Sequence, residues 1–103
     1  MDDNDVVIAF KNAFKKRIDQ FVDALKDTRL GIDQPSGAFY LFIDVSHYDE
    51  DDVRFSEALL RQHYVAVVPG TSFGMPGFIR LSCAASESEL LESAARIKVF
   101  IAK

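Results

Sequence analysis

Apolar side chains recur every three or four residues along the first quarter of the chain, a spacing that places them on one face of a helix. The pattern predicts a helix over residues 5–27, with lysine and aspartate side chains on its solvent-facing side. Asn4 is the expected N-cap, because its side-chain oxygen can accept from a free backbone N–H, and Gly31 is the expected stop signal. The positions at the apolar spacing are Val6, Phe10, Ala13, Phe14, Arg17, Phe21, Ala24 and Leu25.

Two later stretches repeat this spacing and predict further helices over residues 52–63 and 87–101. Each of them carries a signal for its first turn. Asp51 or Asp52 is expected to cap the first of the two, because aspartate is a preferred N-cap residue. The second is preceded by the Ser-x-x-Glu pattern of a capping box, which begins at Ser86.

Runs rich in branched and aromatic residues predict three strands, over residues 38–45, 65–68 and 78–83. Residues 34–37 (QPSG) are typical of a turn, and residues 69–77 (PGTSFGMPG) of a loop between the last two strands. The order of elements is therefore α-β-α-β-β-α. This order predicts a two-layer α+β domain, in which helices pack on one face of a three-stranded sheet.

Both faces of this predicted sheet carry large apolar side chains, because alternate residues of a strand point to opposite sides. Tyr40 and Phe42 share one face, and Phe78 lies on the same face of the last strand. The helices can cover only one face, so the other is expected to be an interaction surface for another chain or another part of the same protein. The alternative is that the first helix or the loops wrap around to cover it.

Composition narrows the class of protein to one globular domain, since 103 residues are 49% hydrophobic and 27% charged. The net charge of −4 disfavours nucleic-acid binding, because neutralising phosphates supplies most of that affinity. No apolar run approaches the ~20 residues of a membrane span, and the MDDND start lacks the basic region of a secretory signal. The single cysteine, Cys83, excludes an intramolecular disulfide and a thiolate-rich metal site, which leaves the reducing cytoplasm as the expected compartment.

Three groups of chemically active residues have simpler interpretations than catalysis. The glycine-rich loop over residues 70–77 leads into a strand, whereas phosphate-binding loops open a helix. The acidic run over residues 44–52 lacks the glycine and the ligand spacing of a calcium loop, so we expect a solvated, helix-capping segment. Cys83 with His47 or His63 could imitate a thiol catalytic pair, but a lone cysteine on an apolar strand face favours core packing.

Arg80 is the strongest candidate for a ligand-binding residue. It lies in the middle of a predicted strand, between Ile79 and Leu81. An arginine is seldom buried without an anionic partner, and its fork-shaped guanidinium matches a carboxylate through two parallel hydrogen bonds. The residues alone allow two partners for Arg80, an internal carboxylate such as Asp44 or an external carboxylate ligand.

Five short segments form a recognisable combination. They are residues 16–19 (KRID), 35–40 (PSGAFY), 65–70 (VAVVPG), 73–74 (FG), and 77–82 (GFIRLS) followed by Ala84. In residue type and spacing they resemble the C-terminal segment of the class I/II, or fold type I, pyridoxal-phosphate-dependent aminotransferases. The combination is most similar to the prokaryotic-type aspartate aminotransferase group, and the resemblance covers nearly all of the chain.

The resemblance implies that residues 1–103 form the small domain of such an enzyme. It implies that Arg80 holds the α-carboxylate of the amino acid or 2-oxo acid, and that Phe73 and Gly37 approach the same pocket. Pyridoxal 5'-phosphate, its Schiff-base lysine and the phosphate-binding residues would belong to a large domain whose motifs this sequence lacks. The resemblance therefore implies no catalytic, cofactor-binding or metal-binding residue in this chain, and a homodimer for the intact parent.

Two functions of different classes follow from these observations. In the first, the chain is the substrate-clamping small domain of an aminotransferase and is inactive as an isolated fragment. In the second, it is a free-standing, non-catalytic α+β module that binds a small carboxylate or a protein partner, since its caps and turns form a complete set.

Overall fold

The computed structural model describes residues 3–34, 40–83 and 86–102, and within the first helix it describes the side chains of residues 12, 13 and 15 onward. The turn expected at residues 34–37, and Gly37 in it, therefore lies mostly outside the described residues. The elements in chain order are α1 (Asp3–Ala24), β1 (Gly31–Asp33), β2 (Tyr40–Asp44), α2 (Asp52–His63), β3 (Val68–Pro69), the 3-10 helix η1 (Gly70–Phe73), β4 (Phe78–Ser82) and α3 (Glu87–Ile101).

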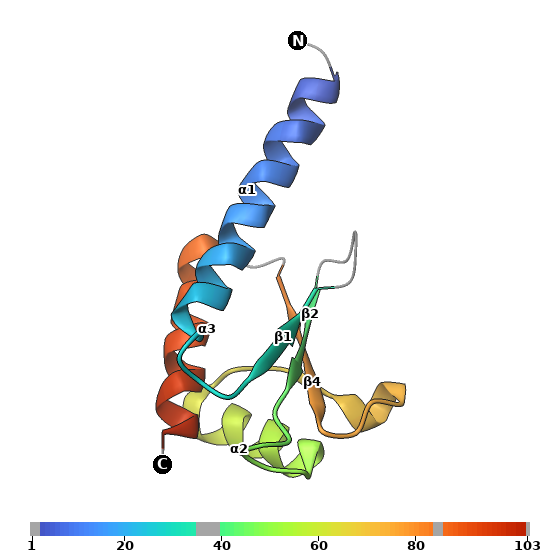
Figure 1. Ribbon diagram of the computed structural model, residues 1–103, viewed down its shortest axis with the longest axis vertical. Helices are drawn as coiled ribbons and strands as arrows, with labels where there is room; N and C mark the ends of the chain where they lie inside the picture. The colour runs from blue at the N-terminus through green and yellow to red at the C-terminus, as the bar shows by residue number, and fades with distance from the viewer. Residues whose placement is uncertain (1–2, 35–39, 84–85, 103) are drawn as a thin grey trace.

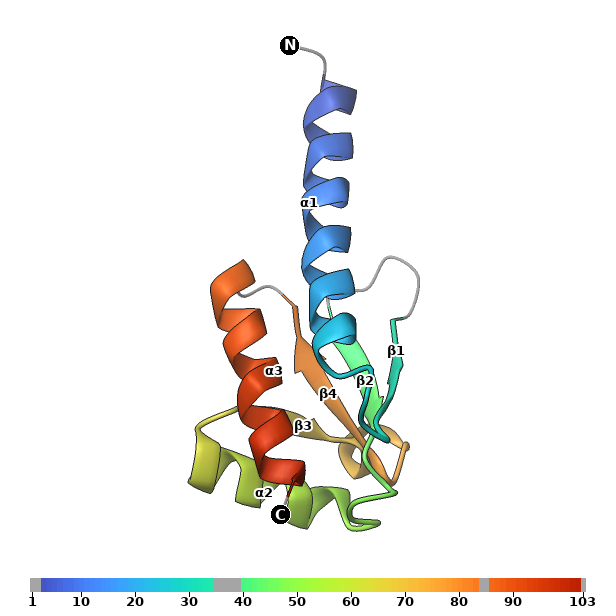
Figure 2. The same ribbon diagram turned by 60° about the vertical axis from the view of Figure 1, so that its left-hand side comes forward.

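The molecule has the two layers expected of an α+β domain. Helices α1 and α3 lie side by side against one face of the sheet, and α2 crosses one end of it (Figure 1 and Figure 2). The N-terminal half of α1 extends beyond the other elements in both views, which accounts for a longest dimension of 48 Å against 27 and 23 Å. The predicted fold class is confirmed.

Within the described residues the sheet has four strands, so the expectation of three is wrong. Its order is β1-β2-β4-β3, and every neighbouring pair is antiparallel. The additional strand is β1, whose Gly31 lies opposite Asp44 of β2. Gly31 does follow the first helix, but the chain turns at Thr28, whose hydroxyl donates to the Leu25 carbonyl, and then continues as a strand. A segment of three residues is too short for an alternating pattern to predict it.

The strand expected at residues 65–68 is also different. Only Val68 and Pro69 pair with β4, and the three residues before them lie in irregular backbone. Proline has no N–H to donate, so Pro69 suits the edge position that β3 occupies. Val65 is nonetheless buried, which explains why this apolar run resembles a strand in the sequence.

One face of the sheet and the three helices form the core. Leu41 and Ile43 of β2 and Ile79 and Leu81 of β4 all have at most 5% of their surface exposed, and they point toward the helices. In α1, Ile18 is buried whereas Arg17 is not, so the inward-facing stripe differs by one residue from the predicted one. The other buried hydrophobic residues are Phe21, Leu25, Val45, Phe55, Leu59, Val65, Cys83, Leu90, Ala94 and Ile97.

The helix caps agree with the sequence in two of three cases. Asp51 is the N-cap of α2, and its carboxylate accepts from the Arg54 N–H at 3.0 Å. Ser86 is the N-cap of α3, and its hydroxyl accepts from the Glu89 N–H at 3.2 Å. The predicted cap Asn4 lies inside α1, because that helix begins at Asp3.

Candidate functional site

Arg80 lies on the face of the sheet opposite the core. Its guanidinium carbon is 5.0 Å from the centroid of the Tyr40 ring and 5.3 Å from that of Phe73, and both rings act as cation–π partners. In the strand register Arg80 is directly opposite Phe42 on β2 and Val68 on β3. Aromatic rings therefore fix the position of the guanidinium.

No carboxylate forms an ion pair with Arg80 among the residues that the structure describes. Asp44, the internal partner considered above, instead accepts from the N–H of Ser46 at 2.9 Å and from its hydroxyl at 2.6 Å. Asp44 also lies opposite Phe78, two positions along β4 from Arg80. An ion pair between Arg80 and Asp44, the internal partner named above, is therefore contradicted.

The outer face of the sheet is partly covered by a loop. Phe73 of η1 packs on Phe42 with ring centroids 5.4 Å apart, and Phe42 in turn contacts Tyr40 edge to face at 5.4 Å. Tyr40 remains 36% exposed, while Phe42 and Phe78 are half-buried. Beside Arg80 the surface forms a pocket of about 410 Å³, lined by Tyr40, Ala66, Val67, Val68, Arg80 and Ser82.

The loop that carries Phe73 is held by a buried carboxylate. Asp52, with 2% of its surface exposed, accepts from the Thr71 N–H and hydroxyl, both at 2.8 Å, and from the Gly77 N–H at 3.1 Å. Burial raises the pKa of Asp52, but these hydrogen bonds outweigh it and hold the pKa below its ordinary value of 3.8. The sequence indicates Asp52 only as a candidate helix cap and as a member of the acidic run over residues 44–52. Its loop partners are 19 and 25 residues away, and no local pattern indicates them.

Glycine is required at the start of this loop. A Cβ atom on Gly70 would lie 1.9 Å from the Met75 carbonyl oxygen and 2.6 Å from that of Phe78. Gly74 ends η1 with φ of 80°, in the left-handed region that glycine enters without strain. The glycines therefore fold the loop tightly over the sheet, and the interpretation of this segment as a structural turn is confirmed.

The other candidate residues do not form a catalytic group. Cys83 is buried, and burial raises the pKa of its thiol to about 11, which keeps it protonated and unreactive. His63 packs edge to face on Phe100 at 5.6 Å, and His47 packs on Tyr48 at 5.0 Å. The expectation that Cys83 belongs to the core is confirmed.

The acidic run has structural partners. Asp49 accepts two hydrogen bonds from the Arg54 side chain, at 2.8 and 2.7 Å, and these lower the pKa of its carboxyl. Asp51 caps α2, and Asp52 holds the loop. Across the described part of the chain, no three His, Cys, Asp or Glu side chains are grouped as metal ligands would be.

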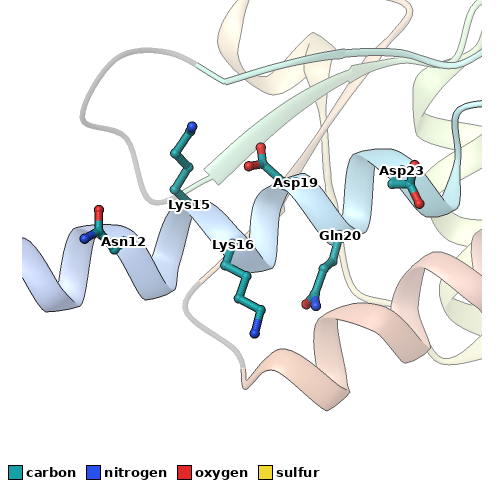
Figure 3. Close-up of a pocket in the computed structure, with 6 residues that line it drawn as sticks. All are labelled: Asn12, Lys15, Lys16, Asp19, Gln20 and Asp23. Atoms are coloured by element: carbon teal, nitrogen blue, oxygen red, sulfur yellow. The ribbon is translucent and has the colours of Figure 1, made fainter.

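A second pocket of about 410 Å³ runs along α1 and is unrelated to Arg80. Figure 3 shows Lys15 and Asp19 on one side of the helix and Lys16 and Gln20 on the other. A single helix supplies all the lining residues, so the pocket is a shallow surface feature. The residues that line this pocket are Asn12, Lys15, Lys16, Asp19, Gln20 and Asp23.

None of the described helices has the length and apolar character needed to cross a bilayer.

Comparison with known proteins agrees with the resemblance seen in the sequence. Residues 3–97 match the family model of the class I and II aminotransferases. The probable aspartate/prephenate aminotransferase of Aquifex aeolicus is 49% identical over 98 residues, which are 91% of this chain and 25% of that protein. The aspartate aminotransferase of Thermotoga maritima superposes with a TM-score of 0.82 at 41% identity, over 99% of this chain and 26% of that structure. The aromatic aminotransferase of Pyrococcus horikoshii superposes with a TM-score of 0.87 at 28% identity, over 98% of this chain and 28% of that structure.

The chain belongs to the class I and II aminotransferases, because the family match covers nearly all of it. It corresponds to a small domain of such an enzyme, and it spans about a quarter of the length of the curated relatives it matches. The names of these relatives include both aspartate/prephenate and aromatic aminotransferases. Membership of the family implies pyridoxal phosphate for the intact enzyme.

The described residues do not fit a covalent site for that cofactor. A lysine that forms a Schiff base needs a desolvated position, where its amine is not held protonated by water. Every lysine whose side chain the structure describes is exposed, and one of them, Lys98, pairs with Asp27 at 3.1 Å. These lysines are Lys15, Lys16, Lys26 and Lys98. Arg80, by contrast, presents a fork-shaped cation, a group whose geometry matches a carboxylate.

Proposed function

We propose that this chain is the substrate-clamping small domain of a pyridoxal-phosphate-dependent aminotransferase, in which Arg80 binds the α-carboxylate of the amino acid or 2-oxo acid. The observation that carries the proposal is a guanidinium held between two aromatic rings with no carboxylate partner among the described residues. A guanidinium stays protonated at any working pH, so the role of Arg80 is recognition and not proton transfer. Its planar fork accommodates both oxygens of a carboxylate.

The neighbouring residues would serve this clamp in distinct ways. The rings of Tyr40 and Phe73 cover the guanidinium and restrict the directions from which water reaches it. A charge pair in such a partly desolvated site is stronger than one in open water. Gly37 lies outside the described residues, and its proximity to the substrate remains a prediction. Movement of the small domain over the bound substrate would exclude more water and bring Arg80 to the carboxylate.

Amino-group transfer needs groups beyond those described here. The reaction would take place where pyridoxal phosphate is bound by a large domain, in a homodimeric enzyme of the cytoplasm, and these 103 residues alone would be inactive. This part of the proposal is tested by adding pyridoxal phosphate to the purified chain and reducing with borohydride. Stable labelling of one defined lysine would contradict it.

The clamp itself is tested by Arg80→Lys in a protein of full family length that contains this segment. Lysine keeps the charge but not the fork, so we expect kcat/KM to fall by the equivalent of roughly 2–5 kcal/mol, with cofactor binding unchanged. Arg54→Lys is the matched control, since Arg54 pairs with Asp49 on the surface. A kcat/KM for Arg80→Lys close to that of the unmodified enzyme would exclude Arg80 as the carboxylate clamp.

A further inference from the structure

Asp52 joins two parts of the chain that are distant in sequence. It is the first residue of α2, yet all three of its hydrogen-bond donors outside that helix belong to the loop between β3 and β4. One carboxylate oxygen accepts from the Thr71 N–H, and the other accepts from the Thr71 hydroxyl and the Gly77 N–H. The carboxylate therefore binds the loop at both its beginning and its end.

The segment enclosed by these hydrogen bonds carries the ring that lies over Arg80. Phe73 stands two residues after Thr71, with its ring centroid 5.3 Å from the guanidinium carbon. Gly77 immediately precedes β4, the strand on which Arg80 lies, and its carbonyl oxygen accepts from the Val45 N–H at 2.9 Å. Asp52 thus fixes both the ring above the guanidinium and the start of the strand that carries it.

An ionised carboxylate is well suited to this position. All three partners are donors, and a carboxylate offers acceptor sites on both oxygens, whereas an asparagine amide offers them on one only. Asp52 pairs with no basic side chain in the part of the chain that the structure describes. Its negative charge is compensated mainly by backbone and hydroxyl donors of the loop, with a smaller contribution from its own backbone N–H at the start of α2, so losing the loop contacts would leave a buried charge poorly compensated.

We propose that Asp52 is a positioning residue for the Arg80 clamp, acting through Thr71, Gly77 and Phe73 without touching the guanidinium. The expected change in carboxylate affinity rests on the proposed function. The hydrogen bonds and the ring contact that link Asp52 to Arg80 do not depend on it. Removing the Asp52 carboxylate releases the loop, moves Phe73 away from Arg80 and lowers carboxylate affinity. Substrate specificity should be unaffected, because the described hydrogen bonds of the Asp52 carboxylate go to Thr71 and Gly77, neither of which lines the pocket.

The test uses the purified chain and nuclear magnetic resonance. In the unmodified chain we expect the ring currents of Tyr40 and Phe73 to shift the side-chain proton resonances of Arg80 upfield, because the two ring centroids lie 5.0 and 5.3 Å from the guanidinium carbon. We expect Asp52→Ala to reduce this shift by half or more, and to weaken binding of maleate, the dicarboxylate used as probe, by roughly three- to tenfold. Asp52→Asn retains one acceptor oxygen and is expected to have an intermediate effect on both readouts.

Leu59→Ala is the matched control. Leu59 is a fully buried core residue of the same helix, and its apolar side chain takes no part in the hydrogen bonds that hold the loop. It lowers stability without releasing the carboxylate contacts, so the Arg80 shift and the maleate affinity should stay unchanged at temperatures where it is folded. Equal changes in Asp52→Ala and Leu59→Ala would reduce Asp52 to a residue of general stability and overturn the proposal.

The two proposals fail separately. An unchanged Arg80 shift in folded Asp52→Ala overturns the positioning role, whatever the chain binds. If Phe73→Ala gives the same reduced shift as Asp52→Ala, the route through the loop is supported. If Arg80→Lys binds maleate as tightly as the unmodified chain, the carboxylate clamp is wrong, while the reduced shift in Asp52→Ala still supports the geometric link from Asp52 to Arg80.

Discussion

The Arg80 guanidinium is 5.0 Å from the ring centroid of Tyr40, a residue on the neighbouring strand. Tyr40 is paired with Ser82 in the register, so it meets Arg80 as a diagonal neighbour on the same face of the sheet. A long side chain and an aromatic ring can span this diagonal distance. The ring of Tyr40 thus orients the Arg80 guanidinium on the face of the sheet opposite the core.

Replacing Tyr40 by leucine is expected to weaken carboxylate binding without unfolding the chain. An exposed cation–π contact contributes about 0.5–1 kcal/mol, so maleate affinity should fall roughly two- to fivefold. The free energy of unfolding should change little, because Tyr40 is 36% exposed. Titration of maleate followed by nuclear magnetic resonance measures the affinity. Tyr64→Leu, at a tyrosine that is 79% exposed, is the control and should bind as the unmodified chain does.

Asp52 is expected to contribute to stability in a pH-dependent way. Since its pKa is lowered in the folded chain, its stabilisation is fully present above the ordinary value of 3.8 and is lost as the pH falls through the folded pKa. Asp52→Asn should therefore be less stable than the unmodified chain by about 1–3 kcal/mol at pH 7. Urea unfolding from pH 7 to pH 2.5 tests the sign, because the difference between the two proteins should shrink below pH 4. A difference that grows on acidification would contradict it.

The sequence predicts the elements that have local signals and misses those that depend on distant partners. Helices α2 and α3 begin and end where the sequence predicts them, because Asp51 and Ser86 act on N–H groups only three residues away. The sequence misses strand β1 because the strand is defined only by its pairing with β2. That pairing forms once the first helix and the turn after it bring the two segments together. Strand alternation alone predicts that Arg80 shares a sheet face with Phe78, whereas the contact of Phe73 with Arg80 depends on the folding of the loop.

Gly70→Ala is expected to be strongly destabilising. The added Cβ would meet the backbone oxygens of Met75 and Phe78, neither of which can move without shifting the loop or β4. Overpacking of this kind costs about 1–3 kcal/mol or more. Thermal unfolding measured by circular dichroism checks the loss. Gly74→Ala is the comparison: apart from its chain neighbours, no atom of the described residues lies within 4 Å of the added Cβ, so only the left-handed backbone opposes the change, at about 1–2 kcal/mol.

Cys83 is expected to resist alkylation while the chain is folded. Its side chain has no exposed surface, and the raised thiol pKa of about 11 leaves almost no thiolate at neutral pH. Iodoacetamide should therefore react at the rate of unfolding events, far more slowly than with a short peptide containing cysteine. The rate is measured by mass spectrometry in the presence and absence of urea. Rapid alkylation of the folded chain would contradict the burial of Cys83 in the core.

The packing of α1 against α3 has a consequence for how the chain folds during synthesis. The two helices stand at opposite ends of the sequence, and both contribute to the same core, Phe21 and Leu25 from one and Leu90 and Ile97 from the other. A chain emerging from the ribosome therefore cannot complete this core until α3 has been made. Until then Phe21 and Leu25 lack their packing partners from α3, a state in which binding by a chaperone competes with self-association.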